Sequence, residues 1–207
     1  MFNKLNILLG IGLAALGTGC GKGESSATTS QQFSFDGVKL IAPSIVKNND
    51  PASTGQGSYM ISNDHHLLIR FETLSKHVSS IVVSEKNRVE AQVTVTADMN
   101  AAAARSSLKM CPITKQWMML ATWSYGHPFG DDGKWGQDGG DFDGDGCVLS
   151  NKGDATVKTL IFDVSRWYTD YVKGRSVNYG LLLVSSDPFS VLGEGSGSYS
   201  PRITFNE

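Results

Sequence analysis

The sequence of 207 residues lacks a surplus of charge of either sign, and this absence limits what the protein binds. It carries 18 Lys and Arg against 20 Asp and Glu, which gives a formal net charge of −2 at pH 7. Proteins that bind nucleic acid or anionic membrane surfaces through their overall electrostatic field carry a basic excess. The composition therefore predicts no nucleic-acid partner.

Long apolar runs and the short motifs of common enzyme classes are also missing. The main apolar stretch, 5–16, has 12 residues, whereas a membrane-spanning helix needs about 20. No G-x-S-x-G, H-E-x-x-H, Walker or dinucleotide-binding motif occurs, and the four histidines lack the spacing of metal ligands. We therefore expect a protein without catalytic activity. The enzymatic alternative is a pair of aspartates that cleaves glycans.

The N-terminus has the order of an export signal. Lys4 provides a positive start, the apolar stretch follows, and small residues precede the cysteine of Leu16-Gly17-Thr18-Gly19-Cys20. This sequence resembles a bacterial lipobox, which implies that residues 1–19 are a lipoprotein signal peptide and that Cys20 is lipidated. The alternatives are an ordinary cleaved signal peptide or a short buried helix.

The lipobox resemblance implies a bacterial cell envelope protein that is attached to a membrane by its lipid. Gly21 follows the cysteine, and the absence of Asp there resembles outer-membrane sorting in a bacterium with two membranes. Residues 20–32 are small and polar, as expected of a flexible tether after the lipidated cysteine. Residues 33–207 have the length of a single domain.

The chain is poor in cysteine, with three in all. If Cys20 carries lipid, Cys111 and Cys147 are left, and an exported location permits a disulfide between them. The alternative is two unpaired buried cysteines, because a sequence does not show whether two Cα atoms lie close together.

Glycine is abundant, with 23 residues, while long helical patterns are few, which is typical of a β-rich domain. Apolar or alternating runs predict strands at 38–42, 59–62, 66–72, 81–83, 89–96, 157–162, 181–184 and 202–205. Antiparallel strands joined by long loops favour a β-sandwich over a parallel α/β sheet.

One short helix is predicted near residues 164–172. Its apolar residues recur at helical spacing and are Val164, Trp167, Tyr168, Tyr171 and Val172. Asp163 stands where an N-cap acceptor belongs, and Gly174 supplies the stop. The spacing places Trp167 on the buried face of this helix.

The block 161–183 resembles the signature of the DNRLRE domains, a secreted β-sandwich family grouped with carbohydrate-binding modules. Residues 66–71 are similar to the family's early "LLRFDL" strand, 139–142 to its "GGDFD" loop, and 200–205 to its closing strand. The run 189–194 departs from the family by lacking its arginine. The resemblance implies an all-β, jelly-roll-like antiparallel β-sandwich that binds polysaccharide.

Three carboxylates form a candidate calcium site. Asp141, Asp143 and Asp145 are spaced at i, i+2 and i+4 and are closed by Gly146, a spacing that brings hard oxygen ligands together in a tight turn. No bidentate glutamate follows as in an EF-hand. The alternative is a solvated acidic loop with glycine turns.

Aromatic residues lie on either side of this acidic loop in the sequence. Sugars stack their C–H faces on aromatic rings, so Trp135, Tyr125 and His127 are the predicted ligand-binding residues. Trp117 and Trp123 are expected in the core, because large aromatic side chains dominate cores. The alternative for Trp135 is that it covers an edge of the sandwich.

Together these features predict a lipid-anchored, non-catalytic protein that resembles carbohydrate-binding modules and binds an unidentified polysaccharide, with calcium as its candidate cofactor. An adhesion or envelope-structural lipoprotein that binds protein partners is the alternative. A glycan-cleaving enzyme is the third hypothesis.

Overall fold

The computed structural model describes residues 32–34, 40–48, 57–72, 74, 90–97, 107–150, 158–193, 196 and 200–206. The predicted signal peptide with Cys20, the tether before Gln32 and the predicted strand at 81–83 lie outside the described residues. Within the described ranges, no helix is both long enough and apolar enough to cross a membrane.

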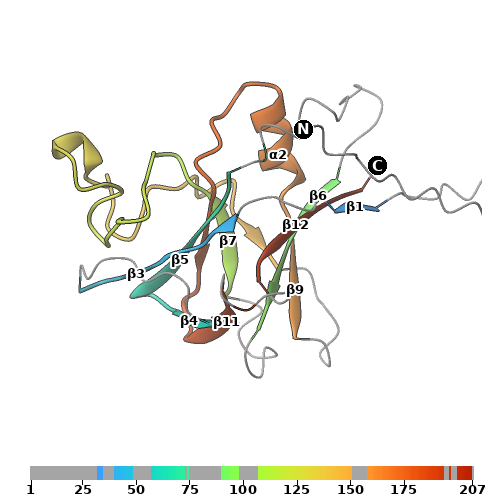
Figure 1. The fold of residues 1–207 in the computed structure, drawn as a ribbon, viewed down its shortest axis with the longest axis horizontal. Helices are drawn as coiled ribbons and strands as arrows, with labels where there is room; N and C mark the ends of the chain where they lie inside the picture. Colours follow the sequence, from blue (N-terminus) through green and yellow to red (C-terminus); the bar gives the residue numbers. More distant parts are fainter. Residues whose placement is uncertain are drawn as a thin grey trace, which may run out of the picture.

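Two antiparallel sheets form the body of the molecule (Figure 1). The first contains, in spatial order, β1 (Gln32–Ser34), β12 (Arg202–Asn206), β6 (Glu90–Thr96) and β9 (Thr159–Asp163). The second contains β2 (Leu40–Ile41), β5 (His65–Phe71), β10 (Leu181–Val184), β7 (Lys109–Pro112) and β8 (Val148–Leu149), with β3 (Ser44–Val46) also paired to β5. A separate pair is formed by β4 (Ser58–Ile61) and β11 (Phe189–Leu192).

In both sheets a strand from the C-terminal part of the chain lies between two strands from earlier in the sequence. In the first sheet β12 lies between β1 and β6, and in the second β10 lies between β5 and β7. This is the strand arrangement of a jelly roll, in which two Greek keys fold over one another. The predicted fold class, an all-β antiparallel sandwich with one short helix, is confirmed.

The second sheet is buried on both of its faces. Leu67 and Ile69 of β5 point into the core between the two sheets, which we call the sandwich core. The neighbouring Leu68, with Leu182 of β10, belongs to a second cluster on the opposite face. A strand covered on both faces needs apolar residues at successive positions, which explains the uninterrupted run of leucines in β10.

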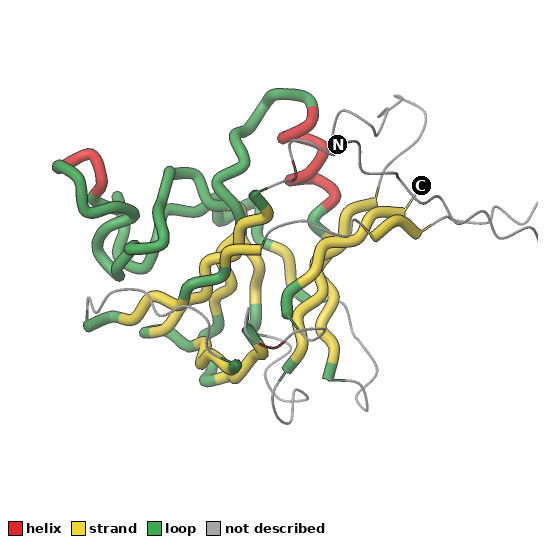
Figure 2. Tube along the Cα trace, in the orientation of Figure 1, coloured by secondary structure: helices red, strands yellow, loops and turns green. Residues whose placement is uncertain are grey.

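The second cluster is covered by a lobe of loops that projects from the sandwich (Figure 2). This loop lobe comprises residues 113–142, between β7 and β8, and contains one short 3-10 helix, η1 (Asp131–Gly133). The molecule therefore has three layers, with the second sheet between the first sheet and the loop lobe.

The predicted helix is present as α2 (Ser165–Val172), which lies at one end of the sandwich (Figure 1). Trp167 and Tyr168 are buried in the sandwich core, as their spacing predicted. The N-cap residue is Val164, one position after the expected Asp163, and its side chain makes no cap hydrogen bond. The carboxylate of Asp163 still accepts a hydrogen bond from the backbone N–H of Ser165 at 3.0 Å, a free amide of the first turn.

Candidate functional site

Three tryptophans build the interior of the loop lobe. Trp117, Trp123 and Trp135 pack with Leu68 and Leu182 of the second sheet, and we call this cluster the lobe core. The indole N–H of Trp117 donates to the carbonyl of Tyr179 at 2.6 Å. Buried indole groups need such partners, so the lobe is attached to the sheet by polar as well as apolar contacts.

The position of Trp135 corrects the sequence analysis. Its side chain is only 4% exposed, and its N–H donates to the carbonyl of Thr122 at 3.0 Å. A ring buried in this way offers no face on which a sugar can stack. Trp135 therefore belongs to the lobe core, together with Trp117 and Trp123, which were expected in a core.

The two other predicted ligand-binding residues lie near the surface of the lobe. Tyr125 is 41% exposed and forms an isolated antiparallel bridge with Lys134. His127 is half-buried, with its ring 6.4 Å from that of Phe129. Neither residue lines the cleft described below, so the structure does not gather the predicted trio at one cavity.

His66 connects β5 with the loop lobe. Its Nδ1 lies 2.8 Å from the carbonyl oxygen of Gly139, and its ring centroid lies 4.7 Å from that of Trp123. Because the carbonyl is an acceptor only, Nδ1 carries the proton of the neutral ring. Burial lowers the pKa of His66 below its usual value of 6.5, since burial disfavours the charged imidazole.

The lowered pKa of His66 predicts a loss of stability on acidification. The unfolded chain takes up a proton near pH 6.5 while the folded chain does not, so the free energy of unfolding falls as the pH drops below about 6.5. One such proton contributes at most about 1.4 kcal/mol per pH unit. Urea unfolding between pH 5 and 8 measures this dependence.

The His66→Gln variant tests the assignment of this pH dependence. In this variant the free energy of unfolding should depend less steeply on pH between the lowered pKa of His66 and pH 6.5. His127→Gln, in the loop lobe, is the control, because His65 itself contributes to the lowered pKa of His66. A His66→Gln variant that keeps the wild-type slope would assign the effect to other groups.

The three aspartates of the candidate calcium site do not point to a common centre. Both carboxylate oxygens of Asp141 accept backbone N–H groups, from Gly136 and Gln137, each at 2.8 Å. Asp143 accepts the N–H of Asp145 at 3.1 Å. Asp141 thus fixes a turn of the loop lobe and Asp143 fixes the following turn.

The predicted calcium site therefore has no ready-made set of ligands. Among the residues that the structure describes, no three His, Cys, Asp or Glu side chains are grouped so that they could hold a metal ion. Calcium needs several oxygen ligands around one point. Both carboxylate oxygens of Asp141 already accept hydrogen bonds from backbone amides. Calcium binding stays a sequence-based prediction.

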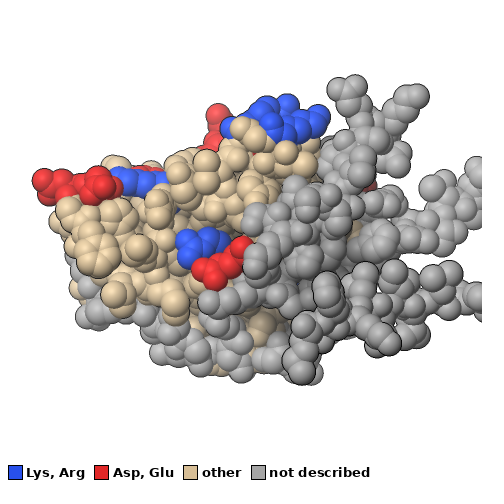
Figure 3. Space-filling view, turned by 45° about the horizontal axis from the view of Figure 1, so that its top comes forward, with Lys and Arg blue, Asp and Glu red and all other residues tan. Residues whose placement is uncertain are grey.

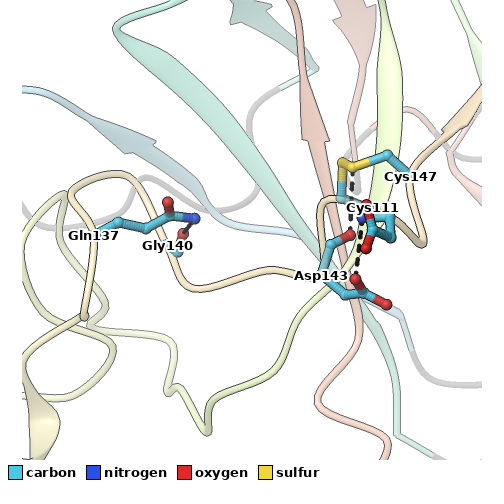
Figure 4. The surroundings of a disulfide bond; sticks show 6 residues. Cys111, Gln137, Gly140, Asp143 and Cys147 are labelled. Carbon is cyan, nitrogen blue, oxygen red and sulfur yellow. Dashed lines mark hydrogen bonds between the residues drawn. A yellow bond between two sulfur atoms is a disulfide. The ribbon is translucent and has the colours of Figure 1, made fainter.

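The predicted disulfide between Cys111 and Cys147 is present (Figure 4). The two Cα atoms are 4.0 Å apart, and the bridge ties the middle of β7 to the residue just before β8. It closes the segment that contains the loop lobe and the Asp143 turn. Figure 4 shows Asp143 beside the disulfide, with the Gln137–Gly140 turn farther along the loop.

A cleft of about 330 Å³ lies between α2, the segment after it, and the turn held by the disulfide. Its lining includes two aromatic side chains, Trp167 and Tyr179, and four charged ones, Arg166, Arg175, Asp143 and Asp170. Clefts of this size with few convergent polar groups on apolar walls are typical of small-ligand sites.

The charged groups of the cleft differ in their partners. The Nε of Arg175 donates to Asp170 at 2.8 Å, and its Nη2 pairs with the same carboxylate. No ion pair or side-chain hydrogen bond joins Arg166 to any other described residue, and Arg166 is exposed. Arg166 is therefore the group that offers unused donors to a ligand.

The local sequence explains how this cleft forms. Gly174 adopts a φ of +66° after α2, a conformation that glycine adopts without strain. The chain then turns back, and the N–H of Arg175 donates to the carbonyl of Asp170 at 2.8 Å. This brings the side chains of Arg175 and Asp170 together at the cleft.

Arg166, Asp170 and Arg175 were not among the ligand-binding residues predicted from the sequence. Arg166 and Asp170 are four positions apart, which places them on one polar face of α2, and Arg175 follows the glycine stop. That polar face was the feature of the sequence from which these ligand candidates could have been predicted. The opposite wall comes from β7 and the Asp143 turn, which are distant in the sequence.

Comparison of the chain with protein-family models and with curated protein sequences finds no match. The resemblance to DNRLRE domains therefore rests on the residues that carry it.

Proposed function

We propose that the protein is a lipid-anchored, non-catalytic glycan-binding protein of the bacterial envelope, which binds polysaccharide at the cleft beside α2. The observation that carries the proposal is the composition of this cleft, where the half-buried Tyr179 stands beside arginine and aspartate side chains. Glycans need both kinds of group, because each sugar has apolar C–H faces and a rim of hydroxyls.

The geometry of the cleft favours binding over catalysis. Asp170 is neutralised by Arg175, and Asp143 holds the amide of Asp145. A glycosidase needs one acid with a raised pKa and a second free carboxylate on either side of the scissile bond. Here both carboxylates are held by hydrogen bonds or ion pairs within the cleft walls, whereas Arg166 has no such partner among the residues that the structure describes.

The anchor and the tether are compatible with this function. Lipid on Cys20 would hold the domain at a membrane surface, and the small, polar residues up to Gln32 would let the cleft reach a polymer outside. The resemblance of block 161–183 to the DNRLRE signature supports the same assignment, because that block builds α2 and the returning segment.

Glycan binding is tested first by presenting the full chain, in nonionic detergent, to an array of neutral and acidic polysaccharides with calcium and with EDTA. At least one polysaccharide should be retained. Arg166→Ala should weaken that binding by at least about tenfold, because a hydrogen bond from a charged donor contributes about 1.5–3 kcal/mol.

The matched control is Arg202→Ala, which removes an exposed arginine from β12, outside the cleft. It should bind like the wild type. If no polysaccharide is retained, or if Arg166→Ala and Arg202→Ala bind equally well, the cleft is not a glycan site. Release of reducing ends from a bound polymer would instead indicate an enzyme.

A further inference from the structure

We propose that the loop lobe is a self-association surface, through which two copies of this chain form a weak symmetric dimer. This inference goes beyond glycan binding and does not depend on it. It starts from an apolar surface on the lobe, which we call the lobe patch and which consists of Met118, Met119, Leu120, Tyr125 and Phe129.

Every side chain of the lobe patch is substantially exposed. The exposed fractions are 41% for Met118, 46% for Met119, 60% for Leu120, 41% for Tyr125 and 65% for Phe129. The largest apolar patch on a soluble protein is often functional, as a site where a partner binds.

Backbone hydrogen bonds hold the parts of the lobe patch side by side. The N–H of Met118 donates to the carbonyl of Gly126 at 2.8 Å, next to Tyr125. The N–H of Gly126 donates to the carbonyl of Gly133 at 2.8 Å, which closes the loop that carries Phe129. The three buried tryptophans pack inside the same loops. The lobe patch is therefore already formed in the single chain.

The size of the lobe patch fits a weak dimer. With about 200 Å² for one large side chain, the exposed fractions amount to roughly 500 Å² of apolar surface per copy. Two copies facing each other would bury about 1,000 Å², which is the lower limit of specific protein interfaces. Such an interface forms at high local concentration.

The charges around the patch are complementary to a second copy. Asp131 and Asp132 of η1 are exposed, and the exposed Lys134 follows directly. Acidic and basic side chains accordingly lie next to one another at the lobe end of the molecule (Figure 3). In a two-fold arrangement each copy contacts the same surface of the other, so the acids of one copy can face the lysine of its partner.

The same charges disfavour a lipid surface as the occupant. Interfacial membrane segments have tryptophan at the lipid side and an excess of lysine and arginine. Here the three tryptophans face inward, and two aspartates stand at the exposed end. A glycan fits less well than a second copy, because three of the five side chains, Met118, Met119 and Leu120, have neither flat rings nor strong hydrogen-bonding groups.

Sedimentation equilibrium of the full chain in a density-matched detergent tests self-association. We expect a monomer–dimer equilibrium with a dissociation constant on the order of 10–100 μM, as for the smallest specific interfaces. Leu120→Ser and Phe129→Ser should each weaken it at least tenfold. Met60→Ser is the matched control, since Met60 is 51% exposed on β4, outside the lobe, and it should dimerise like the wild type.

Charge reversal tests the symmetric arrangement. Lys134→Glu replaces the lysine beside the two aspartates by an acid, and Asp131→Lys with Asp132→Lys replaces these aspartates by basic residues. Each variant alone should dimerise more weakly than the wild type because like charges meet across the two-fold axis. An equimolar mixture of the two should form a heterodimer at least as readily as the wild type forms its dimer.

Three results would overturn the proposal. The first is a monomer at every concentration up to several hundred micromolar, well above the affinity expected for the smallest interfaces. The second is a dimer that Leu120→Ser and Phe129→Ser leave unchanged. The third is a monomer that binds neutral phosphatidylcholine vesicles through the patch, since that would make the occupant a membrane.

Discussion

Replacing both Cys111 and Cys147 by serine should lower the free energy of unfolding by about 4 kcal/mol. The bridge has a sequence separation of 36, and cross-linking a loop of that length removes about this much conformational entropy from the unfolded chain. For a domain of this size the loss corresponds to a decrease of roughly 10 °C in Tm. Urea and thermal unfolding under non-reducing conditions measure it.

Both the chain with the native pair and the double-serine chain should also carry Cys20→Ala, so that the thiol of Cys20 cannot form other disulfides. A reductant should destabilise the chain with the native pair by the same amount and leave the double-serine chain unchanged. Equal stability of the oxidised chain and the double-serine chain would show that the disulfide does not constrain the unfolded state. Because Gly146 lines the cleft directly before Cys147, the serine chain should also bind glycan less tightly.

The sequence predicted those helices and strands whose own apolar spacing shows which of their faces is buried. The stripe through Trp167 and Tyr168 predicted α2 within one residue of its observed start. The alternation in β6 predicted a strand with one buried face, which is what the structure shows at Glu90–Thr96. In both elements the apolar residues recur with the period of the backbone, because one face is buried and the other is not.

The strands that escaped prediction are short and depend on their neighbours. β7, with the sequence Lys-Met-Cys-Pro, has no clear period, yet it lies between β10 and β8 and contributes a cysteine to the disulfide. β3, β8 and β11 have only two to four residues each. Tertiary pairing rather than intrinsic preference makes such segments into strands.

The candidate site was predicted less well than the fold, for the same reason. Trp135 has no apolar neighbours in sequence and was predicted to bind a ligand, but the second sheet and the other two tryptophans enclose it. Asp141 has the spacing of a metal ligand but faces two amides of its own loop. Nearby residues in the chain carry no information about such long-range surroundings.

Gly180→Ala should destabilise the protein by at least about 4 kcal/mol, a size that points to a specific structural conflict. Gly180 has a φ of +95°, and a Cβ at this position would overlap the carbonyl oxygen of Ile69 on β5. Its N–H also donates a hydrogen bond to Oδ1 of Asn178 at 3.1 Å, which fixes the orientation of this peptide. The backbone of β10 therefore enters the sheet at a point that only glycine can occupy.

Gly174→Ala is the matched control, because it separates the conformational cost from the steric one. Gly174 has a φ of +66°, but a Cβ there would meet no atom within 4 Å. Its replacement should cost only about 1–2 kcal/mol, the usual penalty of a left-handed residue with a side chain. Urea unfolding of the two variants, or the soluble yield if Gly180→Ala does not fold, compares them. Equal losses would mean that the backbone conformation alone matters and that the close approach of Gly180 to Ile69 does not determine how β10 joins β5.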